Sequence, residues 1–202
     1  MSNFSVLMPF ARSNETNLII GIEDAGRGNK CNCRCLSCNT PVTARKADVN
    51  QWHFAHRTDK KASTSNECDF SPVTAIALIL RQQFPHLQYF DLDGWYFDDV
   101  MWQLDVNVNG VMIDAFAQDA GNDLSIAIEI PFANGKRACF ENLVSVADIV
   151  LSIDTHAIAT YLSSERSKVT LFRPEQIFEL LLEQSYADFW CMEEKGSCGV
   201  IC

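Results

Sequence analysis

Residues 33–68 read CRCLSCNTPVTARKADVNQWHFAHRTDKKASTSNEC, and this stretch decides how the N-terminal part of the chain folds. It contains four of the nine cysteines and two of the four histidines of a 202-residue chain. A segment this short and loop-rich can hardly bury a core of its own, whereas a metal ion bound by clustered Cys and His supplies folding free energy directly. The stretch therefore predicts a metal-stabilised module.

The ligands of the predicted site come from both ends of this stretch. Cys35 and Cys38 are two residues apart, a spacing with which two thiolates bind one Zn²⁺ from a tight turn. His53 and His56 are three apart and would point to opposite faces of an extended segment, so we expect one of them to bind the ion. We predict a tetrahedral site of Cys35, Cys38, His56 and Cys68, with His53 as a substitute ligand or supporting partner. Four protein ligands make the zinc structural rather than catalytic.

Other cysteines leave alternatives open. Cys31 and Cys33 lie close enough to compete as ligands, and the thiols could also be ordinary buried side chains. We assign no function to the four cysteines of the second half, Cys139, Cys191, Cys198 and Cys202. The first residues, MSNFSVLMPFAR, show no secretory signal, and no apolar run reaches the roughly 20 residues of a membrane span. We therefore expect a cytoplasmic chain with reduced thiols and no membrane partner.

The net charge of -10 is unevenly distributed. Residues 1–70 carry nine Lys and Arg against seven Asp and Glu, a balance of +2, whereas residues 71–202 carry seven against nineteen, a balance of -12. A strongly acidic body resists binding to nucleic acid unless a basic patch makes the contact. The residues predicted to contact nucleic acid, with DNA as the expected partner, are Arg45, Lys46, Arg57, Lys60 and Lys61.

Two aromatic residues, Trp52 and Phe54, lie between these cations, and flat rings together with positive charge suit base and phosphate contacts. The alternative is a solvated basic face with the aromatic rings tucked beneath it.

The second part of the chain has the pattern of an α/β domain. Residues 71–84 begin with Ser-Pro and continue as an apolar run, which predicts a mostly buried helix. Asn109-Gly110 between two strand-like arms predicts a β-hairpin, and residues 123–132 predict a third, central strand. A helix over 136–147, a strand over 148–154 and a closing helix over 173–190 follow. Together they predict helices packed on a mixed sheet.

Two carboxylates of this domain stand in apolar runs. Asp114 lies in the second arm of the hairpin and Glu129 in the next strand, where a charge is costly without a partner. Carboxylates that converge from adjacent strands can hold Mg²⁺ at a phosphodiester. The alternative is that both face solvent by simple alternation. Asp105, in the first arm, offers a further carboxylate or another solvent-facing residue.

The Cys-x-x-Cys pair, the HFAH tetrapeptide and the cysteine just before a helix resemble the N-terminal region of CoiA-like competence proteins. The resemblance implies a small zinc-ribbon-like β module over residues 1–70 and, over 71–202, a restriction-endonuclease-like domain of the PD-(D/E)xK type, an α/β fold with a mixed sheet flanked by helices. It implies a nuclease that hydrolyses DNA with Mg²⁺ or Mn²⁺ held by Asp114 and Glu129.

The chain departs from this family pattern at two places. Pro131 stands where the family carries Lys or Gln, so Lys136 becomes the candidate for the missing amine. Ser71, Thr74 and Arg81 stand in the first helix where Glu and His often line the site. The alternative function is therefore a degenerate nuclease fold that binds nucleic acid or a protein partner in a competence, phage or defence assembly.

Overall fold

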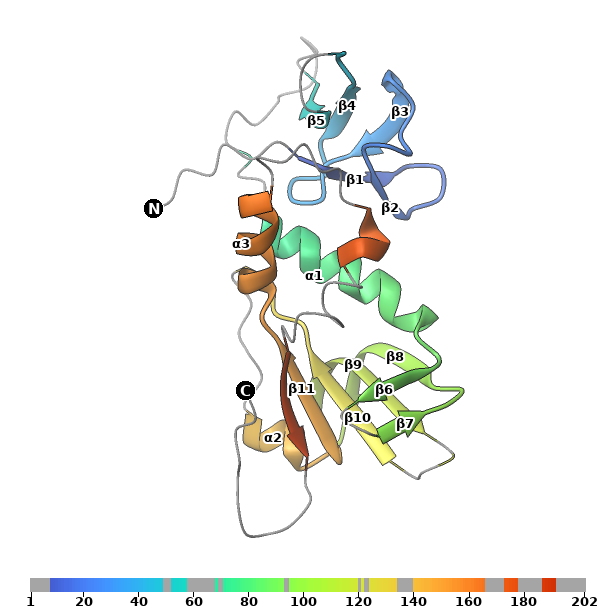
Figure 1. Ribbon diagram of the computed structural model, residues 1–202, viewed down its shortest axis with the longest axis vertical. Coiled ribbons are helices and arrows are strands. Elements are labelled where there is room, and N and C mark those ends of the chain that lie inside the picture. The colour runs from blue at the N-terminus through green and yellow to red at the C-terminus, as the bar shows by residue number, and fades with distance from the viewer. Residues whose placement is uncertain are drawn as a thin grey trace.

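The computed structural model shows two β-sheets on either side of a helix (Figure 1). It describes residues 8–48, 52–57, 68, 71–92, 95–119, 121, 124–133, 140–165, 173–177 and 187–191. The chain is a mixed α/β protein. Within the described residues no helix is long and apolar enough to cross a membrane.

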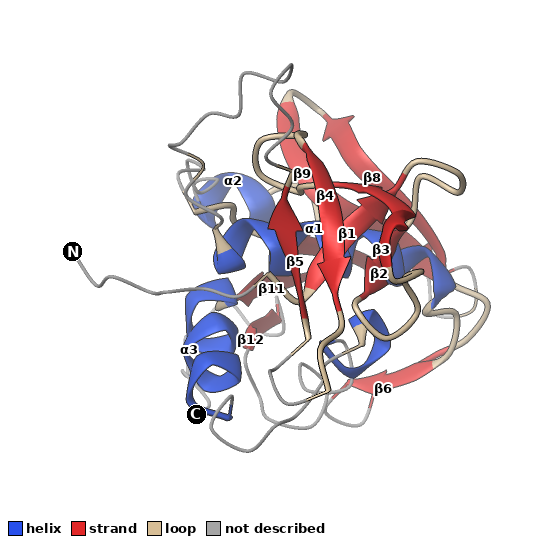
Figure 2. Cartoon of the chain, turned by 90° about the horizontal axis from the view of Figure 1, so that it is seen from above, coloured by secondary structure: helices blue, strands red, loops and turns tan. Residues whose placement is uncertain are grey.

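The N-terminal sheet is built from β1 (Phe10–Ser13), β2 (Ile19–Gly21), β3 (Gly28–Arg34), β4 (Pro41–Arg45) and β5 (His53–His56). Its pairings are all antiparallel, in the order β2-β1-β3-β4-β5, and Figure 2 looks onto this sheet from above. Phe54 is the largest side chain of its small core, which also contains Cys31 and Cys33. Phe54 is therefore a core residue and does not offer its ring to a nucleic acid base.

Helix α1 (Pro72–Gln83) lies between the two sheets (Figure 1). The predicted start is confirmed, because the Ser71 hydroxyl accepts a hydrogen bond from Thr74 N at 3.2 Å and Pro72 occupies the first turn. Apolar residues of α1 share one core cluster with Phe10 and Ile19 of the N-terminal sheet and with residues of the C-terminal sheet. Packing on both sides explains why this helix is apolar around most of its circumference.

The C-terminal sheet is built from β8 (Met101–Val108), β9 (Val111–Asp119), β10 (Leu124–Glu129), β11 (Ile149–Ile153) and β12 (Ala187–Cys191). Its order is β12-β11-β10-β9-β8, so β10 is central as predicted. β10 and β11 are parallel, and the other pairings are antiparallel. The predicted hairpin is confirmed, because Asn109 and Gly110 both adopt positive φ, 51° and 89°, as a type I′ turn requires.

Helices cover both faces of this sheet. α1 and α3 (Thr155–Glu165) pack on one face, where Ile126 and Ile128 of β10 are buried. On the other face, Leu143 of α2 (Phe140–Val144) packs with Ala127 and Val150. A 3₁₀ turn (Phe84–His86) and a short hairpin of β6 (Phe90–Leu92) and β7 (Trp95–Phe97) connect α1 to β8.

The prediction of one closing helix over residues 173–190 is wrong at its end. Residues 174–177 are helical, but Ala187–Cys191 form β12, which pairs antiparallel with β11. Without β12, the edge of β11 would expose unpaired backbone groups, and an Ala-Asp-Phe-Trp segment fits an edge strand as well as a helix end. Neither α3 nor the β6–β7 hairpin was predicted from the sequence pattern.

Candidate metal centre and carboxylate pocket

Asp114 and Glu129 lie next to each other on adjacent strands. The antiparallel register of β9 and β10 pairs Ala115 with Ile128, and one further step along it sets Asp114 opposite Glu129. Both line one pocket of about 290 Å³ between the tip of the β8–β9 hairpin, the end of β10 and Asn142 of α2. The structure thus brings together the two carboxylates that the sequence singled out.

Their environments differ. The Glu129 side chain is buried, 8% exposed, and accepts a hydrogen bond from the Ser152 hydroxyl at 2.8 Å. The Asp114 side chain is 30% exposed and has donors on both oxygens: Arg81 Nη2 at 2.5 Å and Ile130 N at 2.7 Å. Fixed donors of this kind orient a carboxylate in one direction.

Arg81 is the residue at this site whose role the sequence did not reveal. It lies in the last turn of α1, is 7% exposed, and contacts Asp114 and the Ile130 carbonyl, the latter through Nη1 at 2.8 Å. Its guanidinium also lies 4.3 Å from the centre of the Phe132 ring. A cation in an otherwise apolar helix was the available signal, because a buried charge requires a partner.

The other predicted residues of this site have different places. Pro131 lines the pocket, and its carbonyl accepts a hydrogen bond from the buried Thr155 hydroxyl at 3.0 Å. Asp105 is 66% exposed, has a positive φ of 49°, and approaches Arg81 Nε at 3.5 Å. Lys136 lies outside the described residues, as do Cys139, Cys198 and Cys202.

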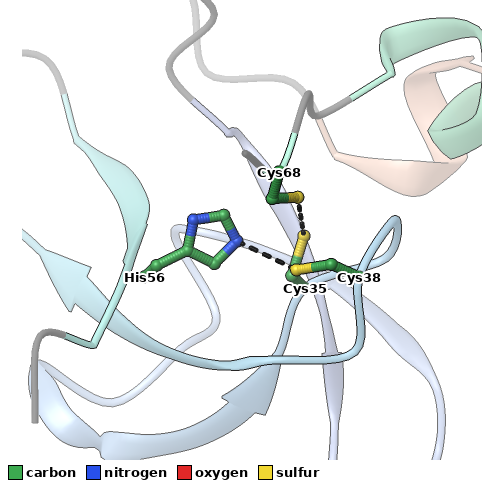
Figure 3. A group of neighbouring side chains, drawn as sticks. All are labelled: Cys35, Cys38, His56 and Cys68. Carbon is green, nitrogen blue, oxygen red and sulfur yellow. Dashed lines mark hydrogen bonds between the residues drawn. The ribbon is translucent and has the colours of Figure 1, made fainter. Parts of the chain in front are cut away.

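A second cluster lies at the edge of the N-terminal sheet. One donor atom each from Cys35, Cys38, His56 and Cys68 lies within 4.8 Å of the others, and Figure 3 shows the four side chains converging. Cys35 Sγ is 3.8 Å from Cys68 Sγ, and Cys38 Sγ is 3.3 Å from His56 Nε2. Among the described residues this is the group of three or more such side chains that could hold a metal ion.

Local structure explains why these four side chains meet. Cys35 and Cys38 stand in the turn after β3, which is closed by the bond from Cys35 N to Thr40 O at 2.9 Å and by Asn39 with a φ of 60°. His56 ends β5 opposite Val42, next to this turn.

The remaining candidate ligands stay outside the cluster. His53 is at the other end of β5, opposite Arg45. Cys33 is buried and donates its thiol hydrogen to the Cys31 carbonyl at 2.8 Å, and the Cys31 thiol donates to the Val42 carbonyl at 3.4 Å.

The thiols of the cluster have shifted pKa values. Burial alone would raise the pKa of Cys38, but hydrogen bonds with Thr40 and with the Cys68 and Cys35 thiols outweigh it and lower that pKa to about 6. Burial raises the pKa of Cys35 and of Cys68. A cation bound among these side chains would also favour the deprotonated form of the other thiols, so that several thiolates would hold it.

Residues 23–65 match the family model described as the N-terminal domain of competence protein CoiA, and this range contains three of the four clustered ligands. Residues 23–65 are therefore similar to this domain, and we call the N-terminal sheet, β1 to β5, together with the Cys35, Cys38, His56 and Cys68 cluster the CoiA-like module. No curated protein and no solved structure matches the chain, so the PD-(D/E)xK type of the second domain stays a prediction.

The fourth ligand, Cys68, lies beyond the residues matched to the CoiA family and close to α1. Ser71 N donates a hydrogen bond to Ser37 Oγ at 3.2 Å, between the two cysteines of the turn. The Cys/His cluster is therefore linked to the start of α1 through Cys68 and Ser71.

The basic residues of the CoiA-like module are only partly available to a partner. Arg45 is exposed. Lys46 donates to the Glu23 carbonyl at 2.8 Å and lies 4.9 Å from the centre of the Trp52 ring, and Arg57 donates to the Asn29 carbonyl at 3.1 Å. Lys60 and Lys61 lie outside the described residues.

Proposed function

We propose that the chain is a metal-dependent nuclease that hydrolyses phosphodiester bonds of DNA in a competence-related process. The observation that carries the proposal is the placement of Asp114 and Glu129 as cross-strand neighbours on one pocket. Carboxylate oxygens are the ligands that Mg²⁺ and Mn²⁺ prefer. An ion held there would polarise the scissile phosphodiester and lower the pKa of a bound water.

The residues around the pair would keep it in position. Ile130 N and Arg81 fix Asp114, and the Ser152 hydroxyl fixes Glu129. Pro131 offers no side-chain donor, so Lys136 is the proposed amine that would steady the developing charge on the phosphate.

We further propose that Cys35, Cys38, His56 and Cys68 bind a structural zinc. A tetrahedral site with Zn–S near 2.3 Å and Zn–N near 2.05 Å places two sulfurs about 3.8 Å apart and a sulfur and a nitrogen about 3.6 Å apart. The Cys35–Cys68 distance of 3.8 Å equals the first value, and the Cys38–His56 distance of 3.3 Å is close to the second.

The zinc-held module would bring the acidic body to DNA. In the described part of residues 71–191 the cations are Arg81, which is buried, and Arg173, which pairs with Glu23 at 3.0 Å. The contacts with phosphates would thus be made by the predicted basic residues of the module, Arg45, Lys46, Arg57, Lys60 and Lys61.

A second candidate is a binding module that has kept the fold and lost catalysis. Two observations favour it: Arg81 already neutralises Asp114, and Pro131 stands where a lysine or glutamine is expected. Such a protein would bind nucleic acid, or a basic protein partner through its acidic body, without cleaving.

Cleavage assays with matched variants separate the two functions. Purified protein with Mg²⁺ or Mn²⁺ should cleave single- or double-stranded DNA, and Glu129→Gln should abolish cleavage while DNA binding remains. Glu141→Gln, an exposed carboxylate on neighbouring α2, is the control and should cleave as the wild type does. Equal cleavage by wild type and Glu129→Gln would refute catalysis at this pocket. DNA binding without cleavage by the wild type would favour the binding module.

A further inference from the structure

Arg81 is placed as a metal ion would be, against the carboxylate of Asp114 in β9. Its Nη2 contacts Asp114 Oδ1 at 2.5 Å, and its Nη1 contacts the Ile130 carbonyl at 2.8 Å. These are two oxygens of the kind that a hard divalent cation would use at this edge of the sheet.

The position of Arg81 is fixed by the fold. The side chain is buried between α1 and the sheet, and the Phe132 ring stacks against it at 4.3 Å. α1 itself is anchored on its other side, where the Gln82 side chain bonds Ile19 N at 2.7 Å and Ile19 O at 3.2 Å. These contacts hold the Arg81 side chain against Asp114, on a helix that packs against both sheets.

The positive charge of Arg81 affects how tightly the Asp114–Glu129 pair can bind a divalent cation. The affinity of a carboxylate site for a divalent cation rises with the number of negative charges it offers. Arg81 offsets the charge of Asp114 at direct contact, while the exposed Asp105 carboxylate is farther away, at 3.5 Å from Arg81 Nε. Arg81 also takes one lone pair of the Asp114 carboxylate, and Ile130 N takes another on the second oxygen. A divalent ion entering the pocket would also be repelled by the guanidinium.

We propose that Arg81 is a built-in counter-ion that keeps the affinity of the Asp114–Glu129 pair for a free divalent cation low. The inference rests on the proposed metal site, but it concerns ion affinity and not cleavage. Arg81 is a positioning residue here: it sets the charge and direction of Asp114 and lines no part of the pocket itself. The site then requires millimolar metal, or the negative charge of a bound phosphodiester, to be filled.

The test is Mn²⁺ binding to the zinc-loaded full chain, followed by electron paramagnetic resonance of the free ion. Arg81→Gln should bind Mn²⁺ at least about tenfold more tightly than the wild type, since a unit charge a few ångströms away is removed. Arg81→Lys keeps the charge and should stay within about threefold of the wild type. The double variant Arg81→Gln, Asp114→Asn should lose the increase in Mn²⁺ affinity seen with Arg81→Gln alone. A purely structural role of Arg81 would not predict this loss.

Two results would overturn the inference. One is a folded Arg81→Gln chain that binds Mn²⁺ no more tightly than the wild type. The other is micromolar Mn²⁺ binding by the wild type that Asp114→Asn removes, a measurement that decides the matter even if Arg81→Gln fails to fold. Weak Mn²⁺ binding by the wild type that stays the same in Asp114→Asn would support the counter-ion role of Arg81. Absence of cleavage would refute the nuclease and leave these affinities, and therefore this inference, standing.

Discussion

Replacing Cys35 with serine should unfold the CoiA-like module while leaving the C-terminal sheet intact. Among the described residues, the buried core cluster of the module contains four large apolar side chains, those of Met8, Ile22, Val42 and Phe54. At about 1.5–3 kcal/mol for each buried side chain, they contribute roughly 6–12 kcal/mol. Structural zinc in small domains contributes about 10–16 kcal/mol, so the contribution of the ion is comparable to that of this burial or larger.

Two measurements test the effect of Cys35→Ser, one of zinc content and one of local unfolding. Native mass spectrometry should find one zinc per wild-type chain and none on Cys35→Ser. Hydrogen–deuterium exchange should show β3 to β5 losing protection while β9 to β11 keep it. Cys33→Ala is the matched control, because Cys33 is equally buried on the same segment but lies outside the cluster, and it should retain the zinc. A Cys35→Ser chain with one zinc, or with protected β3 to β5, would refute the ligand set.

Three further predictions concern the rest of the chain. Gln82→Ala removes both hydrogen bonds to Ile19 and should lower the free energy of unfolding by about 1–2 kcal/mol with zinc content unchanged; an unchanged urea midpoint would contradict this. Hydrogen bonds from the Ser125 hydroxyl and N–H lower the pKa of Asp148 in the folded chain. The ionised carboxylate therefore stabilises the fold at pH values above the unfolded pKa of about 3.9. This stabilisation is lost as the pH falls below this value and through the lower pKa of the folded chain. The stability difference between wild type and Asp148→Asn should thus shrink between about pH 5 and pH 3, and a constant difference would argue against the assignment. Arg45→Ala should weaken DNA binding and reduce the salt dependence by about one counterion, whereas an unchanged salt slope would show that Arg45 makes no phosphate contact.

Features set by neighbouring residues in the sequence were predictable. Ser71-Pro72 marked the start of α1, and Asn109-Gly110 marked the hairpin, because cap and turn geometry depend on a few adjacent residues. The end of the predicted closing helix was wrong because the need of β11 for an edge partner is a property of the sheet and leaves no local signal.

The candidate sites were predictable to the extent that they depend on local patterns. Cys35 and Cys38 were recognisable by spacing, but the choice of His56 over His53 depends on the register of β4 and β5, which sets His56 opposite Val42 beside the turn. Asp114 stood out as a carboxylate in an apolar run. Its pairing with Arg81 depends on how α1 crosses the sheet, which no local pattern contains.

The most direct test of the two proposed metal sites is an anomalous diffraction measurement on crystals grown with zinc and soaked in a high concentration of Mn²⁺. We predict a zinc peak bonded to Cys35, Cys38, His56 and Cys68, and a manganese peak within bonding distance of both Asp114 and Glu129. A map with the zinc peak present and no manganese at these two carboxylates, or manganese bound elsewhere, would contradict the proposed catalytic site.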